Sequence, residues 1–479
     1  MTLRYSYASE LSNLASLVKP QALKNARVVA INQSLVAQLA LPNTWTDNND
    51  LLQMLFSQPS AYTEHAIAQK YGGHQFGFWN PDLGDGRGLL LAQWSDPQGR
   101  NWDLHLKGAG STPYSRFADG RAVLRSTIRE YLASEALHYL GIPTSRALCL
   151  ITSEEPVFRE RQERGAMLVR TCESHLRFGH FEYFYRSGEH DKLQQLFDYT
   201  FAQHFPHCLA TPLPYQSLLN EIVDKTAQMI AYWQAYGFNH GVMNTDNMSI
   251  HGITFDYGPY AFLDDFEPNY ICNHSDPQGR YSFDSQPGIG LWNLNALAQA
   301  FSPYLDFELI RTSLMRYEPQ LLTRYSELMR AKCGLSTAHP DNPALINEWL
   351  ALLAAEHKDY SQSFRLLSEH PVATLTQLRD QFVDRERFDR WAQAYAKRVD
   401  EQGLDEGQRL AQMCQVNPAV ILRNFQAQRV ITLAEQGDFS LFHEYLQALS
   451  EPYTVSAGMQ KFTQTPPDSD KGMALSCSS

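Results

Sequence analysis

The sequence lacks any run of apolar residues near the roughly 18 that a membrane-spanning helix requires. Its first residues also lack the apolar core of a secretory signal and the arginines of a transit peptide. Acidic residues outnumber basic ones, because the sequence has 52 Asp and Glu but 40 Lys and Arg, which gives a formal net charge of −12. We therefore expect a cytoplasmic protein whose partners include neither a membrane nor a nucleic acid.

Cysteine is sparse and scattered along the chain. Its seven cysteines form no C-x-x-C pair, and their dispersion excludes a disulfide framework and a cysteine-based zinc site. Most are expected to be reduced, buried thiols. Cys477 differs because it lies in the polar ending Cys477-Ser478-Ser479, where packing does not explain it.

The chain is long enough for more than one domain, with 479 residues of which 43% are hydrophobic. Changes in hydrophobic period suggest where it divides. We expect an N-terminal subdomain over residues 1–65, a strand-rich small lobe over 66–185, a helical large lobe over 186–330, a helical extension over 331–453 and a flexible tail over 454–479.

The strand-rich region has a recognisable order of elements. Apolar segments at 89–91 and 102–107, separated by a Pro/Gly turn, predict a hairpin. A helical pattern over 119–140 follows, then strand-like segments at 147–152 and 166–171. This order of strand, strand, helix, strand, strand is typical of a protein kinase small lobe and indicates an α+β, kinase-like two-lobed fold.

Lys107 and Glu130 form the first candidate pair of functional residues. Side chains alternate along a strand, so Lys107 points away from the apolar face of its strand. A helix glutamate can hold such a lysine against nucleotide phosphates, as in kinases. Glu135 is an alternative partner for Lys107. For an arbitrary lysine and glutamate, the usual alternative is a solvated lysine and an unrelated surface glutamate.

A glycine-rich segment precedes the predicted hairpin. Gly84 and Gly86 permit close approach of a ligand to the backbone, and Arg87 offers a fork for phosphate oxygens. The order of glycines differs from the kinase G-x-G-x-x-G pattern, and a plain turn explains it equally well.

The segments His240 to Asn247 and Phe255 to Gly258 resemble the kinase catalytic loop and metal-binding turn. Asn247 and Asp256 would hold the metal ion. Val242 stands where kinases place the base aspartate, so the pattern argues against simple phosphorylation. Asp246 is the nearest carboxylate able to act as general base, and His240 is interpreted as a residue that organises the loop.

Arg170, on the predicted strand 166–171, and Arg177, shortly after it, form a basic cluster at the end of the small lobe. Arginine forks bind phosphate oxygens through paired hydrogen bonds. Surface ion pairs are the commoner role of arginine, but the position of these two suits contact with a triphosphate.

These motifs together resemble the selenoprotein O family of kinase-like protein adenylyltransferases. The resemblance is carried by KYGGHQFGFWNPDLGDGRG, LKGAGSTPYSRFADGRAVLRSTIREYLASEAL, LVRTCESHLRFGHFEYF, HGVMNTDNMSIHGITFDYGP and QPGIGLWNLNALAQA. These stretches span about residues 70–300, and the Cys-Ser-Ser ending resembles the end of members that carry selenocysteine.

The resemblance implies transfer of AMP from ATP to Ser, Thr or Tyr hydroxyls of proteins, with Mg2+ or Mn2+ as cofactor. ATP would bind in an orientation flipped relative to kinases, with its α-phosphorus toward the acceptor. Asp246 would be the base, and Asn247 and Asp256 the metal ligands. The positions that would contact the nucleotide are Gly84, Gly86, Arg87, Lys107, Asp119, Gly120, Arg170, Arg177 and Asp256.

Three alternatives remain open at the level of sequence. The protein could use UTP, it could transfer the γ-phosphate as a kinase, or it could be a pseudokinase that binds nucleotide as a scaffold. A separate hypothesis concerns Cys272, sixteen residues after Asp256, where a kinase has its activation segment. We expect a reversible disulfide between Cys272 and Cys477, with two unrelated reduced thiols as the alternative.

Overall fold

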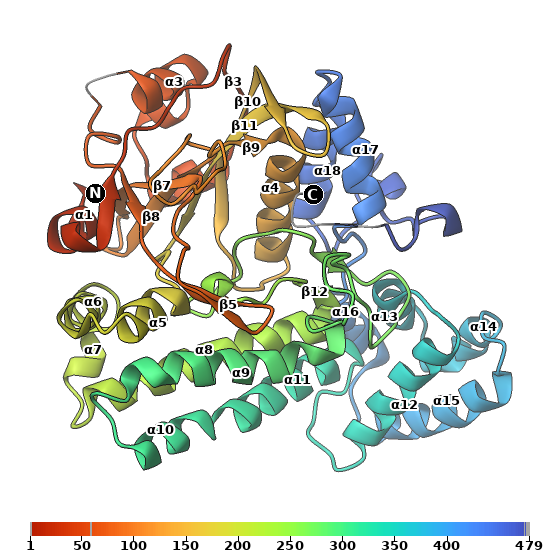
Figure 1. The fold of residues 1–479 in the computed structure, drawn as a ribbon. Coiled ribbons are helices and arrows are strands. Elements are labelled where there is room, and N and C mark those ends of the chain that lie inside the picture. Colours follow the sequence, from red (N-terminus) through yellow and green to blue (C-terminus); the bar gives the residue numbers. More distant parts are fainter. Residues whose placement is uncertain (1, 58–59, 474, 476–479) are drawn as a thin grey trace.

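A computed structural model describes residues 2–57, 60–473 and 475. The protein is a mixed α+β structure in which an N-terminal antiparallel sheet region is followed by a largely helical part (Figure 1). Over the residues described, no helix combines the length and the apolar character needed to cross a membrane.

Nine strands of the described residues form one antiparallel sheet, whose main path runs β2-β4-β7-β8-β11-β10-β3. β1 pairs with β7, and β9 pairs with β11. A short hairpin, β5 (Gly73–Gln75) and β6 (Phe78–Asn80), stands apart from the sheet. The strands of the sheet are β1 (Thr2–Arg4), β2 (Ala15–Leu17), β3 (Arg27–Ile31), β4 (Ile67–Gln69), β7 (Gly88–Ser95), β8 (Asn101–Lys107), β9 (Ala122–Val123), β10 (Arg146–Phe158) and β11 (Gln162–Cys172).

The predicted hairpin is confirmed, since β7 and β8 pair from Gly88 opposite Lys107 to Ser95 opposite Asn101. The two later strands are also confirmed and are longer than predicted. The helix predicted from residue 119 begins instead at Leu124, as α4 (Leu124–Tyr139). The residues before it are extended because β9 pairs with β11.

The two faces of the sheet are covered differently. Leu89 and Leu104 belong to a core with the helices α2 (Gln33–Leu39) and α3 (Asn48–Phe56). The opposite face packs against α4, and its apolar residues continue into the main core of the helical part. Side-chain alternation along β7 produces this division. Leu90 belongs to the main core on the α4 side, whereas its neighbours Leu89 and Leu91 belong to the core with α2 and α3.

The helical part is built around α8, which packs against α9 and α11. A two-stranded ladder of β12 (Phe238–Asn239) and β13 (Ala261–Phe262) follows α8. The helix predicted from Asn342 is confirmed. The remaining helices are α1 (Ser6–Glu10), α5 (Phe178–Arg186), α6 (His190–Gln203), α7 (Pro206–Leu209), α8 (Pro214–Tyr236), α9 (Gln286–Ala298), α10 (Phe307–Leu314), α11 (Tyr317–Lys332), α12 (Asn342–Ala355), α13 (Tyr360–Glu369), α14 (Leu375–Arg379), α15 (Arg385–Asp400), α16 (Glu406–Cys414), α17 (Asn424–Glu435) and α18 (Ser440–Ser450).

The last two long helices return to the sheet region and pack on α4 (Figure 1). Tyr131 of α4 meets Phe442 of α18 edge to face, with ring centroids 5.4 Å apart. Arg129 donates a hydrogen bond to Asn424, the first residue of α17, over 3.0 Å. The C-terminal helices therefore support the helix that carries Glu130.

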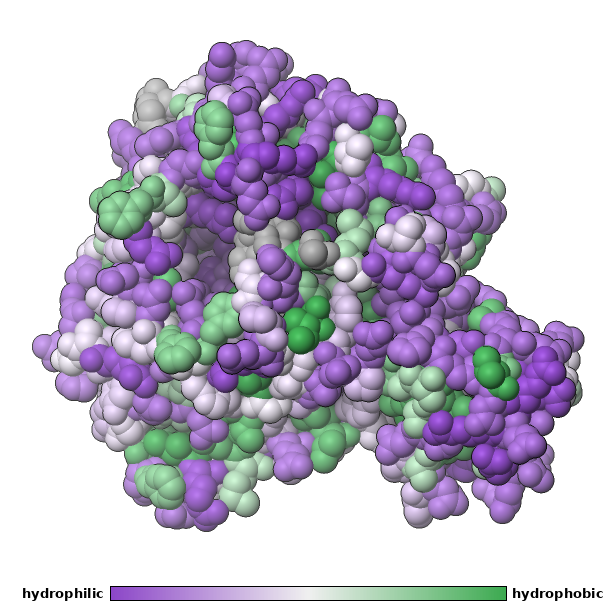
Figure 2. Space-filling model, turned by 45° about the vertical axis from the view of Figure 1, so that its right-hand side comes forward, coloured by the Kyte–Doolittle hydropathy of each residue, from purple (hydrophilic) through white to green (hydrophobic). Residues whose placement is uncertain are grey.

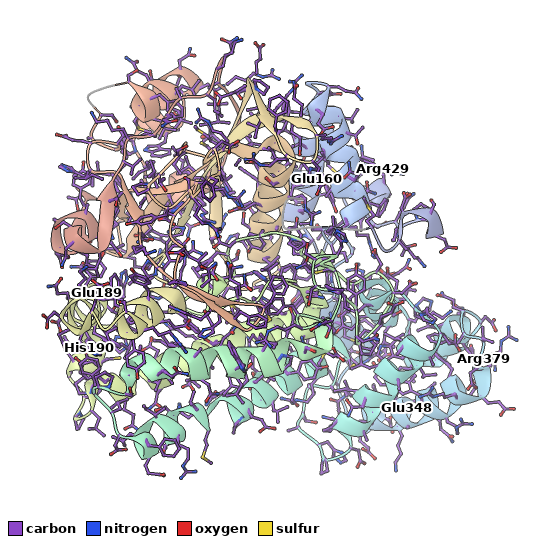
Figure 3. All side chains as sticks on the ribbon, viewed as in Figure 1. Glu160, Glu189, His190, Glu348, Arg379 and Arg429 are labelled. Carbon is purple, nitrogen blue, oxygen red and sulfur yellow. The ribbon has the colours of Figure 1, made fainter. Side chains whose placement is uncertain are left out.

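The surface is mainly hydrophilic, and the face drawn in Figure 2 contains a deep hydrophilic recess. Charged side chains project from most elements, including Glu160 on the β10–β11 hairpin and Arg429 on α17 (Figure 3). This agrees with the charged composition of the sequence.

Candidate active site

A cavity of about 620 Å3 lies between the sheet region and the loops that follow α8. Residues from distant parts of the sequence line it together. Of the residues expected from the sequence, those on its wall are Gly84, Gly86, Arg87, Lys107, Asp119, Gly120, Arg170, Arg177, Asp246, Asn247 and Asp256.

Lys107, at the end of β8, forms a buried ion pair with Glu130 of α4. Burial lowers the pKa of Lys107, and Glu130 opposes that effect. Burial alone would raise the pKa of Glu130, but Lys107 and Arg170 outweigh it and lower that pKa. The alternative partner, Glu135, instead forms two hydrogen bonds with Arg146, of 2.8 and 2.9 Å. Lys107 is therefore held by Glu130 at the wall of the cavity.

Two arginines converge on Asp256. Arg170 of β11 lies 2.5 Å from its Oδ1 and also bonds Glu130 over 3.0 Å, and Arg177 bonds Oδ2. Burial would raise the pKa of Asp256, but the arginines lower it well below its usual value. The Nε atoms of both arginines are buried and have no hydrogen-bond partner among the described residues. The cluster thus holds unsatisfied donors beside an ionised carboxylate.

Asp246 lies in a 3-10 turn, Thr245–Asn247, next to that cluster, because Arg177 donates a hydrogen bond to its backbone carbonyl over 2.7 Å. Its Oδ2 accepts a hydrogen bond from Gln75 over 3.3 Å, whereas its buried Oδ1 has no partner in the part of the chain that the structure describes. Burial raises the pKa of Asp246 to about 7. Asn247 donates its amide N–H to the carbonyl of Val242 over 3.0 Å, so its amide oxygen remains available to the cavity.

His240 is fully buried and does not line the cavity. Its Nε2 lies 3.1 Å from the carbonyl of Phe255, and its ring stacks on Trp233 with centroids 5.3 Å apart. These contacts join the two loops that carry Asp246 and Asp256. This agrees with the interpretation of His240 as a loop-organising residue.

The glycines near residue 85 are required by packing within the protein. A Cβ at Gly84, where φ is 147°, would lie 2.6 Å from the ring of Tyr114, and a Cβ at Gly86 would lie 2.9 Å from the carbonyl oxygen of Tyr114. Between them, Asp85 is buried and accepts a hydrogen bond from the Gln69 backbone over 3.0 Å. The loop is therefore fixed in place, and Arg87 is exposed along the cavity wall.

Asp119 and Gly120 form a second turn on the wall. Asp119 binds Arg159 through both carboxylate oxygens, each over 2.8 Å, and Arg159 lowers the pKa of that carboxyl group. Gly120 has φ of 69°, and a Cβ there would lie 2.0 Å from the carbonyl oxygen of Gly110. The residues alone had not indicated this turn. The Asp-Gly pair was its only local signal.

Reasoning from the sequence missed the role of the β5–β6 hairpin. His74 donates its backbone N–H to Thr245 over 2.7 Å, and Gln75 contacts Asp246. A Cβ at Gly73 would lie 2.8 Å from Asp246 Oδ1. The hairpin therefore packs directly on the turn that carries Asp246, and its paired glycines were the available signal.

Cys272 is buried, and Cys477 lies outside the described residues. The chain next to Cys272 nevertheless contacts the C-terminal segment. Asn273 and Leu475 form a parallel bridge, and His274 donates its N–H to the Leu475 carbonyl over 2.8 Å. Phe462 of the same segment is also buried.

Comparison with known proteins places these residues in a family. The family described as "Protein adenylyltransferase SelO" matches residues 1–450. "Protein nucleotidyltransferase YdiU" of Pseudoalteromonas atlantica is 55% identical over 480 residues, covering 100% of both chains. The proteins of the same name from Pseudomonas aeruginosa and Azotobacter vinelandii are 51% and 49% identical, covering 96% and 97% of this chain and 95% and 96% of their own lengths. The chain belongs to the SelO family of protein adenylyltransferases and is a protein nucleotidyltransferase.

Proposed function

We propose that this protein transfers AMP from ATP to Ser, Thr or Tyr hydroxyl groups of other proteins and releases pyrophosphate. The observation that carries the proposal is the convergence on one cavity of the ion-paired Lys107, the arginines around Asp256, and a carboxylate oxygen of Asp246 that has no partner among the described residues. Cations and hydrogen-bond donors fixed around a cavity are what phosphoryl and nucleotidyl transfer require.

The arrangement of lysine, glutamate and aspartate supports a kinase-like fold of two lobes. Residues 66–185 provide Lys107 and Glu130, as a small lobe does, and residues 186–330 provide Asp246 and Asp256, as a large lobe does. The N-terminal subdomain of residues 1–65 and the helical extension of residues 331–453 complete this division of the chain.

The triphosphate of ATP lies against Lys107, Arg87, Arg170 and Arg177. Arg170 and Arg177 line the cavity beside Asp256, and arginine forks bind phosphate oxygens through paired hydrogen bonds, which supports this placement. The rest of the nucleotide contacts the turns at Gly84, Gly86, Asp119 and Gly120 along the same wall.

Asn247 and Asp256 hold Mg2+ or Mn2+. Both can offer oxygen donors to the cavity, which suit these hard cations. When bound, the ion neutralises charge on the phosphate oxygens. Arg170 and Arg177 bond the two oxygens of Asp256, so a metal ion held there would share that carboxylate with both arginines.

Asp246 acts as the general base. It accepts the proton of the acceptor hydroxyl while that oxygen bonds to the α-phosphorus of ATP. The bond from the α-phosphorus to the bridging oxygen of the β-phosphate breaks, and pyrophosphate leaves with the electron pair. This chemistry requires the flipped orientation of ATP, with the α-phosphorus facing Asp246.

Label transfer tests this proposal. The purified protein is incubated with Mg2+ or Mn2+, an acceptor protein, and ATP labelled at the α- or the γ-phosphate. We expect label in protein only from α-labelled ATP, none with Asp256→Ala, and normal transfer with the exposed control Asp389→Ala. Label only from the γ-phosphate would identify a kinase. Preference for α-labelled UTP would identify a uridylyltransferase. Bound nucleotide without transfer of label would identify a pseudokinase scaffold.

Redox control of the protein through a Cys272–Cys477 disulfide is the second part of the proposal. The contact of Leu475 with Asn273 and His274 supports it, because it brings the segment before Cys477 beside Cys272. Cys272 lies after Asp256, where a kinase has its activation segment, so a bond there would restrain that segment.

A further inference from the structure

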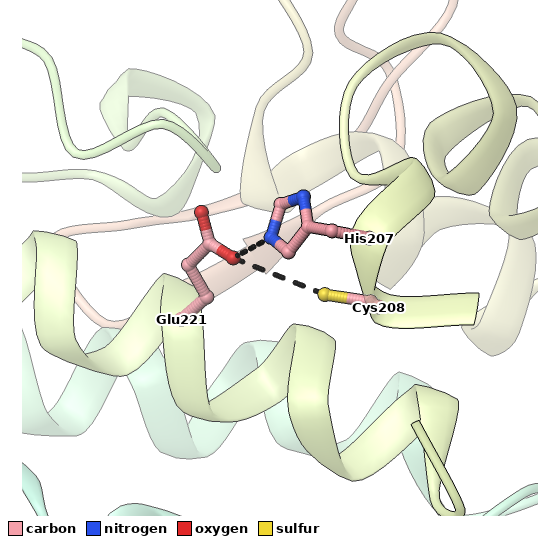
Figure 4. A group of neighbouring side chains, drawn as sticks. All are labelled: His207, Cys208 and Glu221. Atoms are coloured by element: carbon pink, nitrogen blue, oxygen red, sulfur yellow. Dashed lines mark hydrogen bonds and ion pairs between the residues drawn. The ribbon is translucent and has the colours of Figure 1, made fainter. Parts of the chain in front are cut away.

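Helices α7 and α8 bring a histidine, a cysteine and a glutamate together away from the nucleotide cavity. His207 and Cys208 are neighbours on α7, and Glu221 lies on the first half of α8 (Figure 4). One nitrogen of His207, the sulfur of Cys208 and one carboxylate oxygen of Glu221 all lie within 4.8 Å of one another. None of the three residues lines the nucleotide cavity.

We infer that His207, Cys208 and Glu221 form a binding site for a zinc ion. Imidazole nitrogen, thiolate sulfur and carboxylate oxygen are the three donor types that zinc takes in proteins. Three protein ligands leave a fourth tetrahedral position for water, and the partly exposed side chains of His207 and Glu221 give access to it.

The distances fit tetrahedral coordination with a small movement. Ligand atoms around a zinc ion lie about 3.3 to 3.8 Å apart, given metal–ligand bonds of about 2.0 to 2.3 Å. Cys208 Sγ is 3.8 Å from Glu221 Oε2, which already meets that spacing. His207 Nε2 is 2.5 Å from the same oxygen and must move outward, which its exposed ring allows because 61% of the side chain is accessible.

The surroundings of the cluster favour a bound cation. The Cys208 residue is fully buried, and Glu221 Oε2, 3.8 Å away, is a distant hydrogen-bond partner for its thiol. Zinc would displace the thiol proton to solvent, and the thiolate and carboxylate would each offset one of its charges, with the Lys225 ammonium group opposing part of that gain. Lys225 lies 2.9 Å from the other oxygen, Glu221 Oε1, and so fixes the carboxylate from outside, as hydrogen-bonded partners of metal ligands commonly do.

The site joins two elements that the loop of residues 210–213 otherwise connects. α8 continues from Glu221 to Tyr236, directly before the strand and loop that lead to His240. A zinc ion would crosslink the short helix α7 to the long helix α8 and so stabilise the helical part. The expectation that zinc is excluded rested on the spacing of cysteines alone, and this mixed set of ligands falls outside that pattern.

Metal titration tests the inference. The full-length protein is stripped of metal with a chelator and titrated with Zn2+ in competition with a chromophoric chelator, and separately with Co2+ to detect a thiolate-to-metal absorption band. An Asp256→Ala background removes binding at the nucleotide site, where no cysteine is found among the described lining residues. We expect one zinc ion per chain, the Co2+ band, and a rise in Tm on adding Zn2+.

Single substitutions decide whether these residues are the ligands. Cys208→Ser should abolish the Co2+ band and the Zn2+-dependent rise in Tm. His207→Gln and Glu221→Gln should weaken Zn2+ binding by more than about tenfold. Cys414→Ser is the matched control and should change nothing. Absence of the band in the starting protein, or zinc binding that is unaffected by all three ligand substitutions, would overturn the inference.

Discussion

Gln75 donates a hydrogen bond from its Nε2 to Oδ2 of Asp246, 3.3 Å away, across 171 positions of sequence. Its own amide oxygen accepts a hydrogen bond from Asn80 over 3.2 Å, which fixes the orientation of the amide. One oxygen of Asp246 is thus held by the hairpin, and the other is buried without a partner among the residues described.

Replacing Gln75 should impair the chemical step more than ATP binding. A hydrogen bond to a charged group contributes about 1.5 to 3 kcal/mol, so Gln75→Ala should lower kcat by about tenfold to a hundredfold and change KM for ATP little. Steady-state kinetics of AMP transfer measure both constants. Gln98→Ala, on an exposed turn, is the control. A rise in KM with kcat unchanged would contradict the positioning of Asp246 by Gln75.

The two glutamates of α4 should respond differently to substitution. Glu130→Gln removes the charge that holds Lys107 and Arg170, so kcat/KM for ATP should fall by about a hundredfold. Glu135→Gln disturbs the bonds of Glu135 with Arg146, Asn32 and the Ala147 backbone, none of which lines the cavity, so it should lower Tm and leave the kcat/KM of the folded protein close to normal. Calorimetric ATP binding and thermal melts separate the two effects. Equal loss of ATP binding in both variants would refute the assignment.

Lys332 gives the protein a stability that depends on pH. Its ammonium group lies 4.7 Å from the ring of Phe364 and 4.9 Å from that of Tyr236, and no carboxylate pairs with it in the described chain. Burial lowers its pKa from 10.5 to about 7. Between these values the unfolded chain binds more protons than the folded one, so this group makes stability rise with pH over that window.

Lys332→Met should therefore stabilise the protein, by an amount on the order of a few kcal/mol near pH 7 that shrinks toward pH 10. The cation–π contacts favour the charged form and keep the gain below the full cost of burial. Urea denaturation at several pH values measures the difference in free energy of unfolding between the variant and the original protein. Lys397→Met, 80% exposed, should have little effect at any pH. A destabilised Lys332→Met variant would show that the ammonium group is favourable where it lies.

Mild oxidation should join Cys272 to Cys477. Peptide mapping without reductant should then recover one cross-linked peptide, which reductant and Cys477→Ser each remove. Cys414→Ser, which alters a partly buried thiol elsewhere, should leave that peptide in place. Recovery of both thiols unlinked after oxidation would refute the pairing.

Most of the residues expected on the cavity wall could be chosen from the sequence because they belong to short motifs, whereas Asp119 and Gly120 came only from the family resemblance. The functional residue types can be read from short local segments: Asp246 and Asn247, the turn at Asp256, and the arginines at 170 and 177. The alternation of β8 also determined that Lys107 points away from the apolar face of its strand, since side-chain direction in a strand follows position.

Tertiary structure decided which partners these residues have. Glu130 and Glu135 are both buried on one helix, and only the packing of that helix against β10 and β11 directs one to Lys107 and the other to Arg146. Likewise, the contact of Gln75 with Asp246 depends on the folded position of a hairpin far away in sequence. Such long-range contacts follow from the packing of the whole core and leave no period or motif in the local sequence.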